Sequence, residues 1–457
     1  MKYVIIGGTH AGISAARTVL KSDPNAEVTI IEMKKNVSYI SSGINLYFDG
    51  TIDDLADASY ATPDLLRAEG INLILGTEVL NVNTEEKQLY VVDTEEQYSY
   101  INYDKLILAN GSKVVKPKIK GIDNADVILY KNLEESKNAL ERLNTTGKHI
   151  LIVGAGLAGL ALASSIYEGR QGEQVEITLV EAMEGVLMHY VDQEVSNRLI
   201  EDLKGKNIKF ILKNDVHSIN VDQNDKIMSV STTDQEIDCD IVVFSVGLKP
   251  NNDFLRGAVE LNQNNTIKID DYMQTSDENI YAAGDNVEVR QTVSRHRSYQ
   301  PLVNNAVKGA IVAAYNCVGL VKPIKIETTQ GTTGTKLFGH YIATTGITEE
   351  NAPYIGLDVI SSTIEEKIQY NYVKNGSNVM IKVIYEKDTE IIVGAQIYSE
   401  NNMLDMINVM SIAVNMRMTM AKLATMDFYF NPAYNKALNS LNEVALARAM
   451  KPCRNSK

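Results

Sequence analysis

A glycine-rich turn near the start of the chain has the residue types and the spacing that bind a dinucleotide. It follows a short apolar strand predicted for residues 2–6 and consists of Gly7, Gly8, Thr9, His10, Ala11 and Gly12. Glycines let the backbone approach a pyrophosphate, and the helix that follows offers free N–H groups to it. Glu32 ends the next predicted strand, 20 positions after Gly12, where a carboxylate can accept hydrogen bonds from a ribose. Because Thr9 replaces the middle glycine of the motif, a chance glycine-rich turn is the alternative interpretation.

The second turn is a complete G-x-G-x-x-G motif. It follows an apolar strand predicted for residues 150–153 and contains Gly154, Gly156, Ala158 and Gly159. A helix of small residues is expected after it, and the next strand ends at Glu181. One such unit is a weak signal, but two in one chain, each closed by an acid, predict a protein that binds two dinucleotides. An acid at Glu181 suits free ribose hydroxyls and repels a 2′-phosphate, so we expect NADH to be preferred to NADPH. The alternative is a surface glutamate at a strand end.

Further predicted elements must position these turns. Three apolar segments each run into a polar or glycine turn, and they are residues 103–112, 240–247 and 275–285. The last of them is expected to place Asp285 at the end of a strand. Beyond Lys322 the chain changes character, with a strand hairpin predicted for residues 379–397 and a helix for residues 403–416. This pattern indicates a third domain that mixes helices and strands.

Composition excludes several classes of function. The chain has 457 residues, enough for about three domains, and a formal net charge of −14. Because nucleic acids and anionic membranes are themselves negative, we expect neither as a partner. No apolar stretch reaches the roughly 18–20 residues of a membrane span. Cys239, Cys317 and Cys453 are too far apart for a CxxC pair, and the six histidines suggest no metal site. We therefore expect a soluble, cytoplasmic protein.

Together these motifs resemble the two-dinucleotide-binding flavin disulfide reductase superfamily, and within it the NADH peroxidase and NADH oxidase family. Other segments that carry the resemblance are SYISSGINLYFDG, YDKLILANGS, VGLKPN, TSDENIYAAGD, PLVNNAVKG, TTQGTTGTKLFGHYIATTG and DFYFNPAYNK. The resemblance implies an α/β fold with two Rossmann-like domains, one for FAD and one for NADH, plus a C-terminal α+β domain that makes a homodimer. The implied divisions are residues 1–115 with 250–322 for FAD, 116–249 for NAD(H) and 323–450 for dimerisation.

The resemblance also implies roles for single residues. FAD would be held by the first turn from Gly7 to Gly12 and by Glu32, Ser42, Asn110, Lys131, Asp285, Leu302 and Val303. NADH would contact Gly154, Gly156, Ala158, Gly159, Glu181, Tyr190 and Gly247. His10 would lie beside the redox chemistry, as a hydrogen-bonding group or as a residue that only shapes the turn. The ending Asn431-Pro432-Ala433-Tyr434 resembles the peroxidase branch, and Tyr434 fits interface packing equally well.

One departure from the family pattern concerns the reactive group. The family carries a redox cysteine in SxxSCG, whereas this chain has Ser42 at that position. A low-pKa thiolate attacks peroxide and cycles through a sulfenic acid, and a serine hydroxyl does neither. Leu157 and Ala161 also stand where many members have a tyrosine and a glutamate. The serine reflects either natural divergence or an engineered cysteine replacement, and the latter would not account for Leu157 and Ala161.

The expected activity follows from the missing sulfur. Hydride from NADH would reduce the flavin, and dioxygen would then be the available electron acceptor, with hydrogen peroxide as the product. If a cysteine was replaced, the parent activity is an NADH peroxidase or a water-forming oxidase, for which peroxide or dioxygen is the acceptor. A coenzyme A disulfide or polysulfide reductase also needs a cysteine. The third alternative is a non-catalytic FAD and nucleotide binder that senses redox state.

Overall fold

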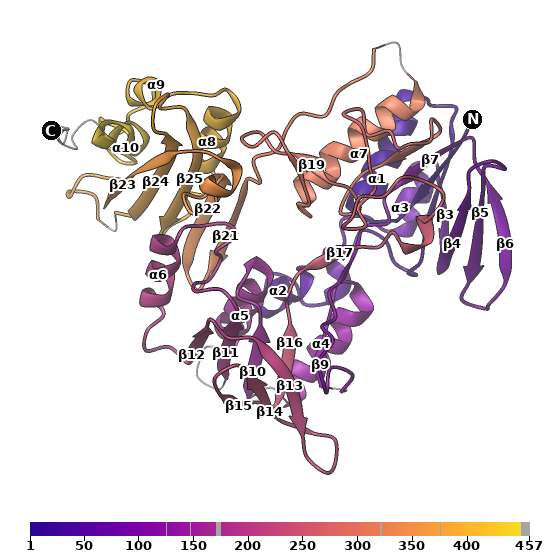
Figure 1. Ribbon diagram of the computed structural model, residues 1–457, viewed down its shortest axis with the longest axis horizontal. Helices are drawn as coiled ribbons and strands as arrows, with labels where there is room; N and C mark the ends of the chain where they lie inside the picture. The colour runs from indigo at the N-terminus through magenta and orange to yellow at the C-terminus, as the bar shows by residue number, and fades with distance from the viewer. Residues whose placement is uncertain (125, 147, 171–174, 320–321, 375, 449–457) are drawn as a thin grey trace.

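The chain forms three lobes arranged around a common centre (Figure 1). The structure is a computed structural model, and it describes residues 1–124, 126–146, 148–170, 175–319, 322–374 and 376–448. The first lobe holds the N-terminus and the third holds the C-terminal part (Figure 1). The second is inserted between two segments of the chain, one that leaves the first lobe and one that returns to it. None of the helices in these ranges is long and apolar enough to cross a bilayer.

The first lobe is built on a five-stranded parallel sheet with the order β18-β7-β1-β2-β3. Its strands are β1 (Lys2–Ile6), β2 (Glu27–Glu32), β3 (Ile71–Leu75), β7 (Lys105–Leu108) and β18 (Ile280–Ala282). Helices α1 (His10–Ser22) and α7 (Val303–Val318) pack against each other and on this sheet, and α3 (Pro63–Ala68) precedes β3. A meander of β4 (Thr77–Asn83), β5 (Gln88–Asp93) and β6 (Tyr98–Asn102) extends the lobe.

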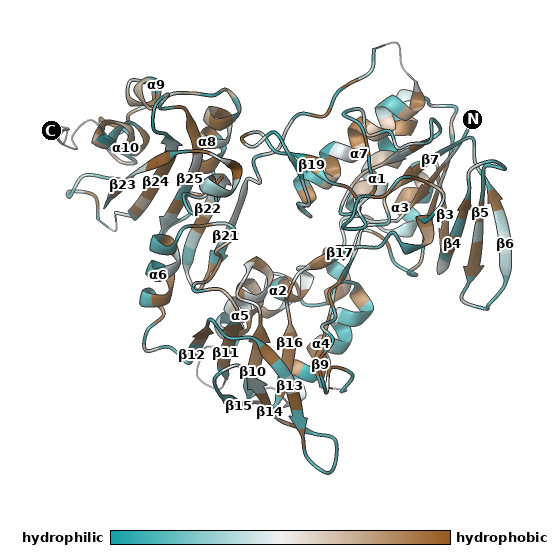
Figure 2. Cartoon of the chain, viewed as in Figure 1, coloured by the Kyte–Doolittle hydropathy of each residue, from teal (hydrophilic) through white to brown (hydrophobic). Residues whose placement is uncertain are grey.

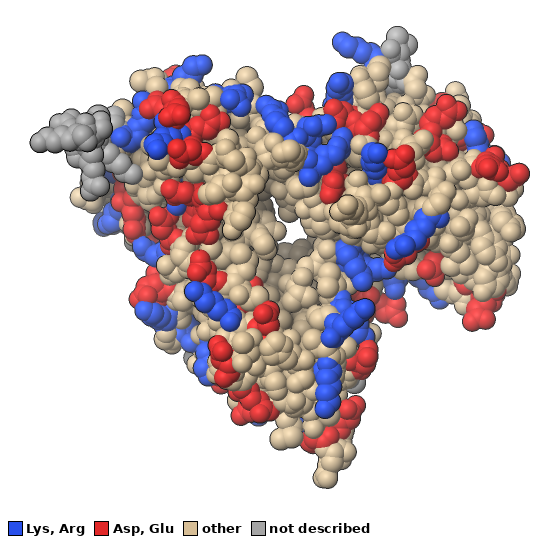
Figure 3. All heavy atoms as spheres, in the orientation of Figure 1, with Lys and Arg blue, Asp and Glu red and all other residues tan. Residues whose placement is uncertain are grey.

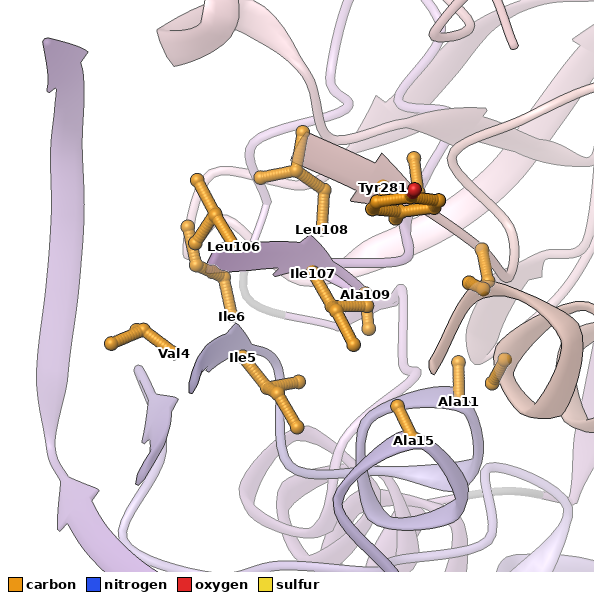
Figure 4. Close-up of a cluster of buried hydrophobic side chains, with 14 of the residues drawn as sticks. Val4, Ile5, Ile6, Ala11, Ala15, Leu106, Ile107, Leu108, Ala109 and Tyr281 are labelled. Atoms are coloured by element: carbon orange, nitrogen blue, oxygen red, sulfur yellow. The ribbon is translucent and has the colours of Figure 1, made fainter. Parts of the chain in front are cut away.

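The core of this lobe shows why its strands are apolar along their whole length. Parallel sheets are covered on both faces, so residues of both parities must be buried. In Figure 4, Ile5 and Ile107 point toward the helix that carries Ala15, whereas Val4 and Leu106 point to the opposite face. All five side chains are at most 2% exposed. The small alanines of α1 let this helix lie close to the sheet.

The second lobe repeats this architecture. Its parallel sheet has the order β12-β11-β10-β16-β9. The strands are β9 (Val127–Ile128), β10 (His149–Val153), β11 (Glu176–Glu181), β12 (Ile208–Leu212) and β16 (Ile241–Phe244). The helices are α4 (Leu133–Thr146), α5 (Leu157–Gly169) and α6 (Gln193–Asp202), and β13 (Val216–Val221), β14 (Ile227–Thr232) and β15 (Glu236–Asp238) form a second meander. Figure 2 shows β10 and β16 in brown and the outer faces of α4 and α6 in teal, as expected for a buried sheet under amphipathic helices.

Two short antiparallel strands carry the chain between the first two lobes. They are β8 (Ser112–Val114) on the way out and β17 (Leu248–Pro250) on the way back, and they pair with each other. After β17 the chain passes the one-turn helix η2 (Asp253–Leu255) and returns to the first sheet as β18. The strands β19 (Val289–Arg290) and β20 (Arg297–Ser298) then precede α7. The first sheet is therefore assembled from two distant parts of the sequence.

The third lobe is an antiparallel sheet with helices packed against it. The sheet order is β21-β22-β25-β24-β23. Its strands are β21 (Thr333–Leu337), β22 (His340–Gly346), β23 (Val359–Lys367), β24 (Asn378–Glu386) and β25 (Ile392–Ser399). The helices are α8 (Met406–Asn415), α9 (Met420–Ala424) and α10 (Ser440–Ala447), with the short turn η3 (Ala352–Ile355) between β22 and β23. The expected α/β class with two dinucleotide-type domains and a C-terminal α+β domain is confirmed, as are the hairpin and the helix expected in the C-terminal part. The sequence boundaries of the three domains stay predictions.

Helix α5 of the second lobe packs against elements of the other two lobes. The short helix α2 (Gly43–Phe48) belongs to the first lobe and packs on α5 so closely that a Cβ built on Gly169 would lie 1.8 Å from the Phe48 carbonyl oxygen. Strand β21 of the third lobe contacts the same helix. At that contact, the Phe338 backbone N–H donates to Ser164 Oγ at 2.7 Å. One helix of the second lobe thereby holds parts of the other two.

A carboxyl pair joins α10 to β23 in the third lobe. Glu366 on β23 and Glu443 on α10 share a hydrogen bond, and Lys436 pairs with Glu366 and lies 4.0 Å from Glu443. This hydrogen bond, burial and the charge of Glu366 together raise the pKa of Glu443 to about 7. Two carboxylates that face one ammonium group cannot both ionise without repulsion. The pair therefore retains a proton close to neutral pH.

We predict that this proton makes the stability of the protein depend on pH. The folded pair holds a proton up to about pH 7, whereas the unfolded Glu443 loses it near its ordinary pKa of 4.5. The free energy of unfolding should therefore fall as the pH rises from about 4.5 to about 7. In the Glu443→Gln variant, the free energy of unfolding should lack the decrease that comes from this proton. At pH 8 the variant should be more stable than wild type by ~1 kcal/mol, a value reduced for solvent screening.

Urea unfolding at fixed protein concentration between pH 5 and pH 8 measures this effect. Asp427→Asn, which removes an exposed carboxylate from the preceding loop, serves as the matched control and should keep the wild-type pH profile. Identical profiles for wild type and Glu443→Gln would contradict the assignment of the proton to this pair.

Candidate functional site

The first glycine turn connects β1 to α1, and its geometry admits only glycine at two positions. Gly7 has a φ of +109°, and a Cβ built on it would lie 2.2 Å from the Ala109 carbonyl oxygen. A Cβ on Gly12 would lie 1.8 Å from the carbonyl oxygen of Gly7. The missing side chains let the turn press against β7 and let α1 start directly beside it. Thr9, His10 and Ala11 complete the turn, and the exposed Thr9 is the N-cap of α1.

Glu32 lies at the end of β2, against this turn. Its carboxylate accepts hydrogen bonds from the backbone N–H groups of Gly8 at 2.6 Å and Lys34 at 2.9 Å. Burial raises the pKa of Glu32, and these hydrogen bonds oppose the rise. The predicted acid is thus held at the carboxyl edge of the sheet, next to the turn that it was expected to serve.

The second turn has the same geometry in the second lobe. A Cβ on Gly154, whose φ is +102°, would lie 2.5 Å from the Ser245 carbonyl oxygen, and one on Gly159 would lie 2.0 Å from the carbonyl oxygen of Gly154. Glu181 ends β11 and accepts hydrogen bonds from the N–H groups of Ala155 at 2.8 Å and Met183 at 2.9 Å. The arrangement of turn and acid therefore occurs twice, contact for contact.

The mouth of the second turn is open. A Cβ built on Gly156 or on Gly247 would meet no atom within 4 Å, and Ala158 is exposed at the start of α5. Gly247 has a φ of +107° and follows β16 at the same carboxyl edge. Tyr190 lies in the loop after β11 and is partly buried. We call the second turn, Glu181 and Gly247 together the second cradle, and it borders open space at the carboxyl edge of the sheet, where dinucleotides bind in folds of this kind.

Asp285 is the centre of a polar cluster at the carboxyl end of β18. Its carboxylate accepts a hydrogen bond from Ser112 Oγ at 2.8 Å and pairs with Lys131 Nζ at 3.1 Å. Gly284, before it, has a φ of +96°, and a Cβ there would lie 3.1 Å from the Cβ of Ala11. The aspartate expected to face a ribityl chain is thereby brought against the first turn, and Lys131 reaches it from the second lobe.

Asn110 has a structural role that its sequence motif did not reveal. Its side-chain N–H₂ group donates to Asn251 O and to Asn252 Oδ1, each at 2.8 Å. Its Oδ1 accepts from Asn286 Nδ2 at 2.9 Å. These bonds join β7 to the returning segment of the chain, so the Asn110 side chain is already engaged within the protein.

Some buried polar atoms in the described part of the chain lack a protein partner. Among the described residues, these atoms include Asn286 Oδ1 and Gln300 Oε1. Gln300 lies just before Leu302, the N-cap of α7, and Val303 is 52% exposed at the start of that helix. Buried acceptors without partners are costly, and a bound ligand with donor groups would satisfy them. We call the first turn, Glu32 and Asp285 together the first cradle. With Asn286 held at the end of β7 by the Leu108 carbonyl and Asn110, this cradle fits a large dinucleotide such as FAD.

Ser42 lies at the N-cap of α2 and is exposed. The segment before it is held on the first turn, because the Ser38 N–H donates to the Gly8 carbonyl at 2.8 Å. Ser38 has a φ of +58°, and its hydroxyl donates to the Ala61 carbonyl at 2.7 Å. Ser42 thus follows, by four residues, a point at which the chain is hydrogen-bonded to the first turn.

His10 faces the same region. Its imidazole stacks on the Tyr60 ring with centroids 5.2 Å apart. Burial lowers the pKa of His10, and the charge of Asp285 opposes this. The ring is therefore mostly neutral at pH 7 and can accept or donate one proton.

The described cysteines lie away from this site. Cys239 belongs to the core of the second lobe and Cys317 to that of the first, and each is at most 4% exposed. Burial raises the pKa of both thiols to about 12. Neither can supply a thiolate to Ser42's surroundings. Cys453 lies outside the described residues.

Leu157 and Ala161, the two other departures from the family pattern, lie on α5. Both pack, partly buried, in the apolar cluster that contains Ile44 and Phe48 of α2. Their apolar side chains thus belong to the same cluster as the helix that follows Ser42.

The three lobes converge around a hollow (Figure 3), and two of them carry a glycine turn closed by an acid, the arrangement that binds a dinucleotide. Such a site defines an oxidoreductase that transfers electrons between two bound dinucleotides. A model of the pyridine nucleotide-disulphide oxidoreductase family matches residues 1–310, and a model of the dimerisation domain of that family matches residues 332–441. The chain belongs to the pyridine nucleotide-disulphide oxidoreductase family, and the resemblance found in the sequence is confirmed.

Individual relatives agree with this assignment. An NADH oxidase from Enterococcus faecalis is 34% identical over 448 residues, which cover 98% of this chain and 99% of the relative. A water-forming NADH oxidase from Lactobacillus brevis, solved with NADH bound, is 30% identical with a TM-score of 0.93 and 98% coverage of both chains. An NAD-dependent persulfide reductase from A. fulgidus is 26% identical with a TM-score of 0.93, covering 98% of this chain and 83% of the other.

Sequence reasoning missed several residues that build the site. Tyr60, Ser112 and Ser38 are involved through stacking and hydrogen bonds that join distant segments. Ser112 stands directly after the predicted glycine turn of residues 110–111, and this position was the available signal. Ser38 opens the SxxSCG-like segment, and its place in that motif was a signal, whereas Tyr60 carried none.

The two glycines of the second turn should respond differently to alanine. Gly159→Ala places a methyl group 2.0 Å from a backbone oxygen and should lower the free energy of unfolding by ~3 kcal/mol. Gly156→Ala has open space and a φ of −78°, so stability should change by less than about 1 kcal/mol. Its methyl group would instead occupy space that a pyrophosphate needs, so NAD⁺ binding should weaken. Thermal unfolding and NAD⁺ titration measure the two effects, and equal loss of stability in both variants would contradict this geometry.

Proposed function

We propose that the chain is an FAD-dependent NADH oxidase that reduces dioxygen to hydrogen peroxide. NADH oxidase activity agrees with the relatives and with the two cradles. The observation that favours peroxide over water is Ser42, together with the burial of the two described cysteines away from it. The proposed reaction is NADH + H⁺ + O₂ → NAD⁺ + H₂O₂, in which two electrons and two protons reach one dioxygen molecule.

The first cradle would hold FAD, with Gly7 to Gly12 at the pyrophosphate, Glu32 at the ribose and Asp285 at the ribityl chain. Leu302 and Val303 would line the flavin. Bound FAD would supply the redox chemistry, accepting hydride from the nicotinamide and passing electrons to dioxygen. His10, as a mostly neutral imidazole, would hold or release the proton that the reduced oxygen species needs.

The second cradle would hold NADH. Gly154, Gly156 and Gly159 would admit the pyrophosphate, and Tyr190 and Gly247 would border the nicotinamide half. The Glu181 carboxylate is fixed by two backbone N–H groups, so it stays in place to accept ribose hydroxyls and to repel a 2′-phosphate. This arrangement supports NADH as the electron donor.

The third lobe supports a homodimer. Large apolar side chains are exposed on α8 and in the segment that leads to α10, namely Ile412, Met416, Tyr429, Phe430 and Tyr434. An exposed apolar patch of this kind is typical of an interface. The occupant that fits the match to the dimerisation domain is a second copy of the chain.

The product test follows purified, FAD-loaded protein with NADH in air. NADH loss, dioxygen uptake and peroxide are recorded together, and one peroxide per NADH is expected because the described site offers no sulfur to reduce peroxide further. Two NADH consumed per dioxygen without peroxide would overturn the proposed product and indicate water formation. Absence of NADH loss with FAD bound would favour a nucleotide-binding sensor instead.

Restoring the sulfur tests the role of position 42. Ser42→Cys places a thiol at the start of α2, beside the first cradle, where it can attack peroxide and form a sulfenic acid. We expect this variant to gain anaerobic NADH consumption that depends on added peroxide, at least tenfold above wild type. Ser42→Ala is the matched control and should not gain it. A Ser42→Cys variant without the gain would argue against peroxidase ancestry.

A further inference from the structure

The loop that follows β11 lies directly on the second glycine turn. The Leu187 N–H donates to the Ala155 carbonyl at 3.0 Å, and the Tyr190 N–H donates to the Leu187 carbonyl at 2.7 Å. Leu187 has a φ of +59°, so the loop turns back on itself here. Because it follows the strand that ends in Glu181, this loop borders the carboxyl edge where a nucleotide binds.

The far end of this loop is held by another lobe. Thr344 Oγ1 on β22 donates to the Tyr190 carbonyl at 2.7 Å. Gln396 on β25 accepts from the Asp192 N–H at 2.9 Å and donates from Nε2 to the Asp192 carboxylate at 2.7 Å. The loop is therefore bound between the second turn and the sheet of the third lobe.

A buried lysine completes this connection. Lys382 on β24 is 2% exposed, and its Nζ lies 3.0 Å from Asp192 Oδ2 and 2.8 Å from Glu349 Oε2, with Glu194 as a third partner. Burial acts to lower the pKa of Lys382, but the three carboxylates outweigh it and raise the pKa above its ordinary value. The Lys382 ammonium group is charged at every physiological pH, and removing it would leave the carboxylates around it, among them the buried Asp192, without compensation.

We propose that Lys382 and Asp192 are positioning residues for NADH, through which the third lobe fixes the loop of residues 183–192 against the second turn. This inference rests on the proposed function, since it assigns NADH to that turn. Neither residue lies in a glycine motif, and neither belongs to the groups expected to touch a dinucleotide. Their effect on the nucleotide passes along the chain from Asp192, which Gln396 holds, to Tyr190 two residues before it. From there two backbone hydrogen bonds lead to the turn, Tyr190 N–H to the Leu187 carbonyl and Leu187 N–H to the Ala155 carbonyl.

The test measures NAD⁺ binding to FAD-loaded protein by calorimetric titration. Asp192→Asn keeps the size of the side chain and leaves Lys382 paired with Glu194 and Glu349, so the contact between the lobes persists. Lys382→Met removes the cation. We expect both variants to raise the Kd for NAD⁺ and the KM for NADH about tenfold, with kcat within about twofold of wild type.

Glu365→Gln is the matched control at the same contact between lobes. Glu365 on β23 pairs with Arg198 on α6 at 2.6 Å, away from the loop. This variant should bind NAD⁺ as wild type does. The melting temperature and FAD content of every variant are recorded, because a merely structural role would change these without changing the Kd for NAD⁺.

The outcomes separate the two proposals. A wild-type Kd in Asp192→Asn and Lys382→Met overturns the positioning role alone, even if the variants melt earlier. If Lys382→Met does not fold, Asp192→Asn decides the question by itself. A wild-type protein that holds FAD but binds no NAD⁺ overturns the proposed function, and this inference with it.

Discussion

The close contact between α2 and α5 is the constraint on which the rest of the structure depends. Gly169 touches the backbone at the end of α2, and no side chain fits between them. This contact fixes the segment of the first lobe that starts at Ser42 on the second lobe, while β21 of the third lobe packs on the same helix. Helix α5 is composed mostly of small and aliphatic residues. Because its side chains are small, the backbones of neighbouring elements can pack closely against it. The site therefore lies where the lobes converge.

The two cradles show how one physical solution serves two ligands. In each, a glycine with positive φ presses on the neighbouring strand, a second glycine lies on the first, and an acid accepts two backbone N–H groups. The difference between them lies in what surrounds the cradle. Asp285, His10 and Ser38 lie at the first, whereas the second opens at Gly156 and Gly247. This difference agrees with the proposal that the first cradle retains FAD and the second exchanges NADH.

Much of the local structure could be predicted because it depends on residues close in the chain. The strands before both turns, the helices after them and the acids at the following strand ends are set by apolar runs, glycines and short spacing, and their bounds in the structure differ from the expected ones by one or two residues. Asn110 shows the limit of such reasoning. Its motif indicated a ligand contact, whereas its side chain is hydrogen-bonded to Asn252 and Asn286, more than 140 positions away.

The sequence by itself determined the two-cradle plan, the family and the absence of the family's cysteine at position 42, because glycine spacing, a terminal acid and a residue type are local and countable. Only the tertiary structure decided which groups meet. Lys131 reaches Asp285 from another lobe, His10 stacks on Tyr60, and Lys382 reaches Asp192 across 190 positions. Such pairings arise from how sheets and helices pack, since burial of apolar faces brings distant polar groups together and obliges them to find partners.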